Sequence, residues 1–254
     1  MNPLLIDLDG VLRINNRPAP NVKEFLDFIT DRKINACIVS NSTLSTSEDV
    51  NEFFKFFGIE TKIPIMTASS AAAIYAKQNY KHVAVYCEER VKRIFYEILD
   101  YENPEAVIIG DYGKRWDFKT MNEIFVHVFN GADLIAMQKN RYWETAADGI
   151  LLDAGPFVAA IEYATNKQAR LIGKPSPYYF HAALRILGFA NDEKFLMIGD
   201  DLETDIKCTK ELGSKSLLIY TGKTKYPLDN NSEVKPDYEA MNLTEAMKIL
   251  ESMY

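Results

Sequence analysis

The sequence predicts an α/β protein that has a parallel sheet and a second α/β domain inserted into the first. Short apolar runs alternate with helical patterns over residues 3–58, which is the rhythm of strand–helix–strand units. The same alternation returns over residues 169–254, after a middle stretch that has strands and helices of its own. Each polar motif of interest directly follows an apolar run. Ligand-binding residues occupy such positions at the carboxyl ends of parallel strands.

The first part of the chain alternates regularly between strand and helix. Residues 3–8, PLLIDL, and residues 34–40, INACIVS, are apolar runs typical of buried strands. Between them, residues 22–32 have apolar side chains at helical spacing, which predicts a helix with one buried face. Residues 45–58 predict a second helix, since they open with a Ser-x-x-Glu capping box and end at a glycine.

The middle of the chain repeats this rhythm. Strands are predicted at residues 82–87, 106–110 and 133–138, and helices near residues 88–99 and 119–129. This is enough material for a second, smaller α/β domain.

The last part returns to the pattern of the first. Glycines end two of its helices, and its final helix is amphipathic. The predicted strands are 169–173, 195–199 and 216–220, and the predicted helices are 176–188, 204–213 and 242–254.

The resumption of the pattern predicts one α/β domain that is interrupted by an insertion. A chain of 254 residues, 47% of them hydrophobic, can bury the cores of one or two domains. We therefore expect a core domain formed by residues 1–75 and 171–254, with the inserted domain at residues 76–170.

Composition excludes several classes of protein. The chain has 29 basic and 36 acidic residues, a net charge of −7 and no basic run, so nucleic acid is not an expected partner. No apolar stretch approaches the roughly 20 residues that span a bilayer, and we expect no membrane partner. Cys37, Cys87 and Cys208 are odd in number and far apart, which favours buried thiols and a cytoplasmic location over disulfides or a metal site. The three histidines are equally scattered along the sequence, so a histidine metal site is not expected.

Two motifs gather acidic residues after apolar runs. Asp7 and Asp9 lie in DLDG, and Asp200, Asp201 and Asp205 lie in GDDLETD. Two carboxylates about 4 Å apart repel by about 4 kcal/mol at an effective dielectric constant near 20. Bound Mg²⁺ would neutralise such a cluster, because it takes a few oxygen ligands from the protein and keeps sites open for water and substrate phosphate.

Two further motifs fit a phosphoryl group. Ser40, Asn41 and Ser42 follow a predicted strand and offer hydroxyl and backbone N–H donors where a helix is about to begin. Lys174, in GKPSP, supplies a mobile positive charge. We expect these four residues to bind the phosphate of a substrate.

The first acidic pair then predicts the chemistry. Asp7 can attack phosphorus and form an aspartyl-phosphate intermediate. Asp9 points to the other side of an extended strand, and a turn at Gly10 could bring it back toward the leaving group as general acid and then base.

Each motif by itself has a simpler explanation. A lone D-x-D-G could belong to a calcium loop, although position 11 is valine where that loop carries Asp or Asn. Ser-Asn-Ser-Thr alone is often a helix cap, Gly-Lys-Pro alone a surface turn, and Gly-Asp-Asp alone a loop with solvated acids. The four motifs together, each after a strand, favour the catalytic interpretation.

In this order and context, the four motifs resemble those of the haloacid dehalogenase (HAD) superfamily, whose members are mostly Mg²⁺-dependent phosphatases with a Rossmann-like core. The resemblance implies that Asp7 is the nucleophile and that Asp9 is the acid/base, with its backbone carbonyl also on the metal. It implies further roles for Ser40 and Lys174 in phosphate binding. It places Asp7, Asp9 and Asp200 on the metal, with Asp201 and Asp205 supporting them.

The inserted domain resembles the α/β cap of HAD subfamily IIA. The segments SNST, GKPSP and GDDLETDI are similar to those of that subfamily. Residues 110–118, 139–143 and 155–165 are similar to the branch that includes phospholysine phosphohistidine inorganic pyrophosphate phosphatase. The resemblance covers essentially the whole chain. It implies a small phosphorylated substrate with a P–N or pyrophosphate bond, and a homodimer formed through the cap.

Two alternatives stay open. The chain could be a sugar-phosphate or nucleotide phosphatase of the same subfamily. It could instead be a regulatory or protein-binding module that holds a phosphoaspartate, although receiver domains place the phosphate acceptor on a later strand and lack a cap. Substrate selectivity is expected in the inserted domain, where aromatic and cationic residues could equally serve packing. These residues are Tyr112, Lys114, Arg115, Trp116, Asn140, Arg141, Tyr142 and Trp143.

Overall fold

The computed structural model describes residues 2–145 and 149–254, which form two compact units. The first unit contains the chain up to Ser40 together with Ser47–Met66 and Lys174–Tyr254. The second contains Asn41–Thr46 and Thr67–Gly173. The chain therefore passes between the units at four places, and two of these passages lie beside Ser40 and Lys174.

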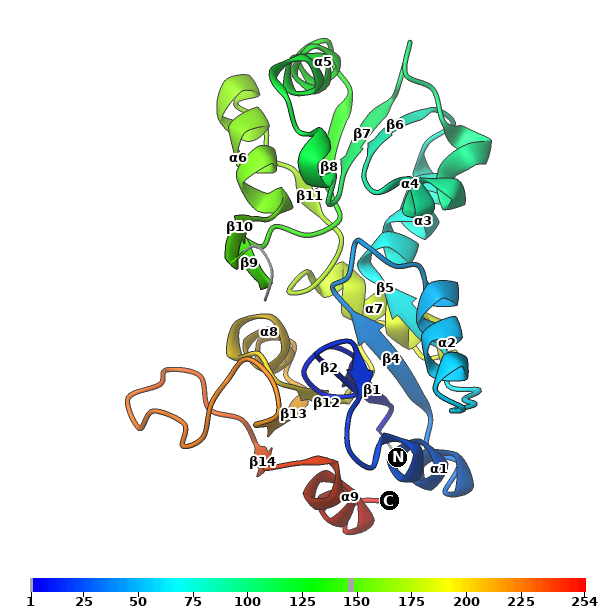
Figure 1. The fold of residues 1–254 in the computed structure, drawn as a ribbon, viewed down its shortest axis with the longest axis vertical. Helices are drawn as coiled ribbons and strands as arrows, with labels where there is room; N and C mark the ends of the chain where they lie inside the picture. The colour runs from blue at the N-terminus through cyan, green and yellow to red at the C-terminus, as the bar shows by residue number, and fades with distance from the viewer. Residues whose placement is uncertain (1, 146–148) are drawn as a thin grey trace. The chain divides into compact units, whose positions relative to one another are not determined.

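A six-stranded sheet forms the centre of the first unit, in the order β14-β13-β12-β1-β4-β5 (Figure 1). β1 pairs in parallel with both β4 and β12, so that Ile6 lies between Ile38 and Ile198. β12 and β13, and β13 and β14, also pair in parallel, which brings the carboxyl ends of these strands to one edge of the sheet. The strands are β1 (Leu4–Asp7), β4 (Ala36–Ser40), β5 (Ile65–Thr67), β12 (Leu196–Gly199), β13 (Lys215–Ile219) and β14 (Tyr238–Ala240).

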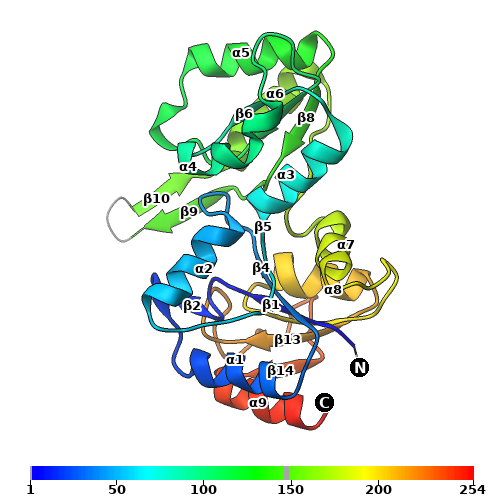
Figure 2. The same cartoon turned by 90° about the vertical axis from the view of Figure 1, so that its right-hand side faces the viewer.

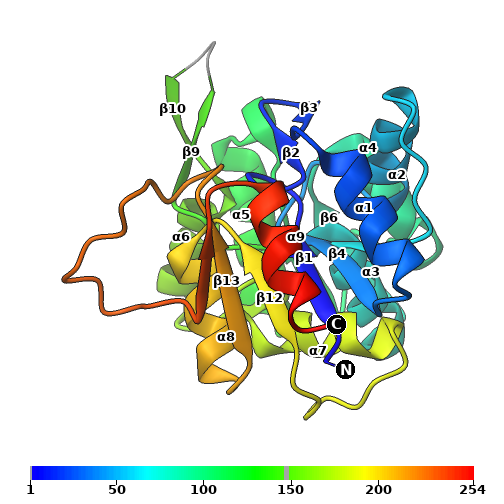
Figure 3. The same cartoon turned by 90° about the horizontal axis from the view of Figure 1, so that it is seen from below.

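Helices cover both faces of this sheet (Figures 2 and 3). One face packs on α1 (Val22–Asp31), α2 (Ser47–Phe56) and α9 (Leu243–Glu251). The elements α7 (Pro177–Ile186), the π-helical segment η3 (Leu202–Lys207) and α8 (Cys208–Glu211) contact β4, β12 and β13. A short hairpin of β2 (Arg13–Ile14) and β3 (Arg17–Pro18) follows β1.

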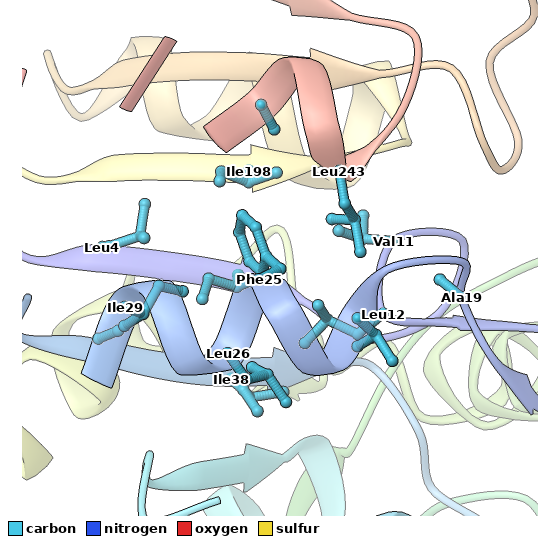
Figure 4. Close-up of a cluster of buried hydrophobic side chains, with 14 of the residues drawn as sticks. Leu4, Val11, Leu12, Ala19, Phe25, Leu26, Ile29, Ile38, Ile198 and Leu243 are labelled. Atoms are coloured by element: carbon cyan, nitrogen blue, oxygen red, sulfur yellow. The ribbon is translucent and has the colours of Figure 1, made fainter. Parts of the chain in front are cut away.

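The amphipathic helix α1 supplies much of the core on its side of the sheet. Its Phe25 is fully buried and lies among Leu4, Ile198 and Leu243 (Figure 4). Burying an aliphatic or aromatic side chain of this size contributes about 1.5–3 kcal/mol, so this cluster holds β1 and β12 in place. These are the two strands that lead into the acidic motifs.

The second unit has its own parallel sheet, in the order β11-β8-β7-β6. Helices α5 and α6 contribute Ile124, Val128, Val158 and Ile161 to its core. Side chains of Asp117 and Asp153 cap the first turns of these two helices. The strands are β6 (Val83–Tyr86), β7 (Ala106–Ile109), β8 (Asp133–Ala136) and β11 (Arg170–Leu171), and β9 (Tyr142–Thr145) and β10 (Gly149–Leu152) form a separate antiparallel hairpin. The helices are α3 (Ala68–Asn79), α4 (Glu89–Lys92), η1 (Arg93–Ile98), η2 (Gly113–Arg115), α5 (Phe118–Phe129) and α6 (Ala154–Thr165).

The predicted α/β class with a parallel sheet is confirmed. Some elements were not predicted: β5 and β14 have three residues each, and α3 is rich in alanine and lacks a clear apolar stripe. The helix expected at 204–213 begins earlier, with the π-helical segment η3. The role of the second unit as a cap stays a prediction. No helix in the described residues has both the length and the apolar character needed to cross a membrane.

Candidate active site

Three buried carboxylates meet at the carboxyl edge of the first sheet. Asp7 ends β1, Asp200 follows β12, and Asp205 lies in η3. Each offers one oxygen atom, and these atoms lie within 4.8 Å of one another. The two parallel strands bring Asp7 and Asp200 together, and η3 turns Asp205 back toward them.

Lys174 joins two of these acids. Its Nζ donates to Asp7 Oδ1 at 2.6 Å and to Asp205 Oδ1 at 2.6 Å. The Lys174 side chain is 3% exposed, so both ion pairs are shielded from water. Removing Lys174 would leave two buried carboxylates without their cation, which is costly.

Burial has the largest effect on the pKa values of Asp7, Asp200 and Lys174. It raises the pKa of Asp7 well above its usual range, against the opposing effect of Lys174, and the carboxylates of Asp205 and Asp200 raise it further. Burial, with help from Asp205, raises the pKa of Asp200 to about 6. Burial alone would lower the pKa of Lys174, but Asp205 and Asp7 outweigh it and raise that pKa. Burial thus disfavours the ionised forms of Asp7 and Asp200, and Lys174 offsets this only in part.

Asp9 lies apart from the three buried acids. Its side chain is 54% exposed and is held by Arg13, whose Nε donates to Oδ1 at 2.7 Å and whose Nη2 donates to Oδ2 at 2.9 Å. Ser40 Oγ also donates to Asp9 Oδ2, at 3.3 Å. The intervening turn requires Gly10, which has a φ of +86° and leaves no room for a Cβ beside the Asp200 carboxylate.

Ser40 ends β4 and is anchored by Tyr179 of α7. The Ser40 N–H donates to Tyr179 Oη at 2.9 Å, and Tyr179 Oη donates to backbone oxygens of Ser40 and Met66. Burial raises the pKa of Tyr179, so its hydroxyl keeps its proton. A buried tyrosine thus fixes the strand end that presents Ser40 to Asp9.

Asn41 and Ser42 follow Ser40 directly in the chain and belong to the second unit. Both are half-buried, and Ser42 Oγ accepts from the Leu44 N–H at 3.3 Å, as in a serine turn. Their predicted binding of phosphate is not tested by these contacts and stays a prediction.

Asp201 is tied to the loop after β13. Its Oδ2 contacts Lys223 Nζ at 2.5 Å, and its Oδ1 accepts from the Glu203 N–H at 2.9 Å at the start of η3. Burial would raise the pKa of Asp201, but Lys223 and the hydrogen bonds lower it. Asp201 therefore lies beside the acidic cluster as part of a separate ion pair.

The site has two more negative than positive formal charges. Its five carboxylates face the three cations Lys174, Arg13 and Lys223. One divalent cation would balance this sum. In the described part of the chain, Asp7 Oδ2 and Asp200 Oδ1 accept no hydrogen bond, whereas both oxygens of Asp205 do. These two oxygens belong to buried aspartates beside a deficit of two positive charges, an arrangement that suits Mg²⁺.

Sequence reasoning missed Arg13, Tyr179, Thr221 and Lys223. Arg13 and Lys223 pair with predicted site residues, and Thr221 Oγ1 donates to the Gly10 carbonyl oxygen at 2.5 Å. The only available signal was the polar segment TGK directly after the strand at 216–220, the same position relative to a strand as the other motifs.

Several of the residues considered for selectivity serve packing within the second unit. Arg115 stacks over Tyr112 and donates to the Cys87 carbonyl oxygen at 3.0 Å. Trp116 stacks on Phe157, with ring centroids 4.3 Å apart. By contrast, Tyr142 of β9 is 63% exposed and Trp143 is 37% exposed. The hairpin residues are thus the more available of these candidates.

Two family models match the chain. One, described as haloacid dehalogenase-like hydrolase, matches residues 4–98, and one described as HAD-hydrolase-like matches residues 171–246. These segments contain all of the acidic residues of the site and Lys174.

Named relatives and solved structures agree with these matches. The mouse haloacid dehalogenase-like hydrolase domain-containing protein 2 is 32% identical over 226 residues, which cover 89% of this chain and 86% of the relative. The bovine phospholysine phosphohistidine inorganic pyrophosphate phosphatase is 31% identical over 221 residues, covering 86% and 80%. The structure of p-nitrophenyl phosphatase from Archaeoglobus fulgidus superposes with a TM-score of 0.89 at 25% identity and covers 98% of both chains.

The matches extend over both parts of the first unit and include every acidic motif at the sheet edge. The chain therefore belongs to the haloacid dehalogenase-like hydrolase family, as an enzyme of its phosphatase class.

Proposed function

We propose that the chain is a Mg²⁺-dependent phosphatase that hydrolyses a small phosphorylated substrate through an aspartyl-phosphate on Asp7. The observation that carries this proposal is the buried contact of Lys174 with Asp7 beside Asp200 and Asp205. A carboxylate next to an ammonium group is suited to receive a phosphoryl group once a divalent cation balances the two excess negative charges of the site.

In the first step, a carboxylate oxygen of Asp7 attacks phosphorus while the bond from phosphorus to the leaving atom breaks. Asp9 donates a proton to that leaving atom. Lys174 offsets negative charge on Asp7 and on the transferring group, and Ser40, Asn41 and Ser42 donate to the phosphoryl oxygens.

In the second step, water attacks the phosphorus of the aspartyl-phosphate. Asp9, now ionised, takes a proton from this water, and the bond between Asp7 and phosphorus breaks. Inorganic phosphate leaves and both carboxyl groups return to their starting states.

Asp7, Asp200 and the backbone carbonyl of Asp9 would hold Mg²⁺, with Asp205 and Asp201 supporting them. When bound, the cation neutralises charge on the phosphoryl oxygens and on the acids. Asp205 keeps Lys174 in position, because its Oδ1 accepts from Lys174 and its Oδ2 accepts from the Asp201 N–H at 3.2 Å.

The substrate class we propose is phosphohistidine, phospholysine or pyrophosphate. The support is the bovine relative, whose name gives these three substrates. We also propose a cytoplasmic location, since Cys37, Cys87 and Cys208 are buried free thiols, and a homodimer formed through the second unit.

The experiment is a release assay for phosphate from p-nitrophenyl phosphate, phosphohistidine, phospholysine and pyrophosphate, with Mg²⁺ and with EDTA. We expect activity only with Mg²⁺, and a loss of about 1,000-fold or more in Asp7→Asn. Asp27→Asn is the matched control, because Asp27 is an exposed residue of α1 that pairs with Lys23. Full activity of Asp7→Asn, or unchanged activity in EDTA, would contradict the proposal.

A further inference from the structure

The turn that follows β13 lies directly on Asp200. The Lys223 N–H donates to Asp200 Oδ2 at 2.5 Å, and the Thr224 N–H donates to the Asp200 carbonyl oxygen at 3.0 Å. Gly222 allows this approach, since a Cβ at that position would overlap the Asp200 carboxylate. The turn therefore fixes both the backbone and the side chain of Asp200.

The same turn also holds the segment after β1. Thr221 Oγ1 donates to the Gly10 carbonyl oxygen at 2.5 Å, and the Gly10 N–H donates to the Arg13 carbonyl oxygen at 2.8 Å. Both peptide groups that flank Gly10 are thus held. One of them carries the Asp9 carbonyl oxygen, which lies in the same peptide plane as the Gly10 N–H and points in the opposite direction.

The turn at residues 221–224 consequently joins two segments that come from neighbouring strands. Its two backbone donors bind Asp200, the Thr221 hydroxyl binds the Gly10 segment, and Lys223 Nζ binds Asp201. The bond from the turn to the Gly10 segment depends on the Thr221 side chain, so this link can be removed by substitution without removing the two backbone bonds to Asp200.

We infer that Thr221 is a positioning residue for the divalent cation, which sets the spacing between Asp200 and the Asp9–Gly10 peptide. This inference rests on the Mg²⁺ site of the proposed function. Thr221 touches neither substrate nor cation and acts through Gly10. Loss of its hydroxyl should therefore weaken Mg²⁺ binding much more than it slows the saturated enzyme.

The test compares Thr221→Val with Thr221→Ser in the full-length protein. Valine keeps the shape and removes the donor, whereas serine keeps the donor. Thr30→Val is the matched control, because the Thr30 hydroxyl likewise donates to a backbone carbonyl oxygen, that of Leu26, but within α1.

The first measurement is Mg²⁺ binding by titration calorimetry without substrate. A neutral hydrogen bond of ordinary net strength corresponds to an effect of about 3- to 10-fold, so we expect the Kd of Thr221→Val to rise by that factor. Thr221→Ser should restore the Kd to within about twofold. The Mg²⁺ concentration for half-maximal hydrolysis should rise in parallel in Thr221→Val, with a smaller change in kcat.

The outcomes separate this inference from the proposed function. If the unchanged protein binds Mg²⁺ and releases phosphate while Thr221→Val binds Mg²⁺ equally well, the inference is wrong and the function stands. If Thr221→Ser binds Mg²⁺ as weakly as Thr221→Val does, the hydroxyl is not what supports Mg²⁺ binding, and the inference is also wrong. If the unchanged protein binds no Mg²⁺, both the function and the inference are wrong. Should Thr221→Val not fold, the comparison of Thr221→Ala with Thr221→Ser decides between the same outcomes.

Discussion

The ammonium group of Lys174 lies 2.6 Å from a carboxylate oxygen of Asp205, and both side chains are buried. The two residues are 31 positions apart and belong to different elements, the loop before α7 and the segment η3. The other oxygen of Asp205 accepts from the Asp201 N–H. Asp205 is thereby engaged on both sides, and its main effect on the site is to set the place and charge of Lys174.

Asp205→Asn should weaken Mg²⁺ binding without weakening the metal-free fold. Asp205 raises the pKa of Asp7 and of Asp200, which means that it repels both when ionised. Lys174 keeps Asp7 as a partner after the substitution, so no charge is left unpaired. We expect the free energy of unfolding in EDTA to change by less than about 1 kcal/mol and the Kd for Mg²⁺ to rise about tenfold or more.

Calorimetry and urea unfolding measure these two quantities. Asp27→Asn serves as a control, since Asp27 is an exposed acid of α1 that pairs with Lys23. A Kd for Mg²⁺ that stays the same in Asp205→Asn would speak against the role assigned to Asp205.

Asp9→Asn should slow the hydrolysis of different substrates to different extents. A general acid matters most when the leaving group is strongly basic, because such a group departs poorly without a proton. We expect kcat to fall about 100- to 10,000-fold for an alkyl phosphate and clearly less for p-nitrophenyl phosphate, whose leaving group is weakly basic. Steady-state kinetics on the two esters measure the difference. Equal losses on both would contradict a role as acid.

Mg²⁺ binding should weaken as the pH falls through about 6. Burial and Asp205 raise the pKa of Asp200 to about 6, and only the ionised carboxylate binds the metal. Below that value the apparent Kd should rise about tenfold per pH unit, as protons compete with Mg²⁺. Titrations between pH 5 and 8 would measure this, and a Kd that does not change over the range would exclude Asp200 as a titrating ligand.

The same raised pKa of Asp200 predicts how the stability of the metal-free protein depends on pH. The folded protein holds the Asp200 proton more tightly than the unfolded chain does, whose aspartates titrate near 3.9. The stability that this provides is complete below about 3.9 and is lost as the pH rises through about 6. The free energy of unfolding in EDTA should therefore respond to pH more weakly in Asp200→Asn. An identical pH dependence in both proteins would contradict the raised pKa.

Phe25→Ala should destabilise the first unit by about 3–5 kcal/mol, because it removes a fully buried ring from the core beneath β1 and β12. Urea unfolding measures the loss. Phe56→Ala is the control, since Phe56 is 84% exposed at the end of α2, and it should change stability by no more than about 0.5 kcal/mol. Similar losses in both variants would show that the cluster around Phe25 does not hold the unit together.

The fold class could be predicted because buried parallel strands are written as short apolar runs. LLI in β1 and LMIG in β12 are uninterrupted apolar runs, and each is followed at once by an aspartate. Short or atypical elements carry too little signal: β14 is YEA, and α3 is mostly small residues without an apolar stripe.

The site residues that could be predicted are those that directly follow a predicted strand. The contact of Lys174 with Asp205 and the anchoring of Ser40 by Tyr179 join segments 31 and 139 positions apart. Such contacts depend on how helices return to the sheet, which local patterns do not encode. The sequence patterns pointed to Lys174 as a cation of the site but not to Arg13 and Lys223, which also pair with its acids.

Two of the four passages between the units lie at Ser40–Asn41 and Gly173–Lys174, immediately beside residues of the site. Exchange of the second unit for that of a relative would place the new junctions next to Ser40 and Lys174. A chimaera that preserves the chemistry must therefore be joined further inside the first unit, within β4 before Ser40 and within α7 after Tyr179. The boundary between the two structural units is therefore not a suitable junction for exchanging them between relatives.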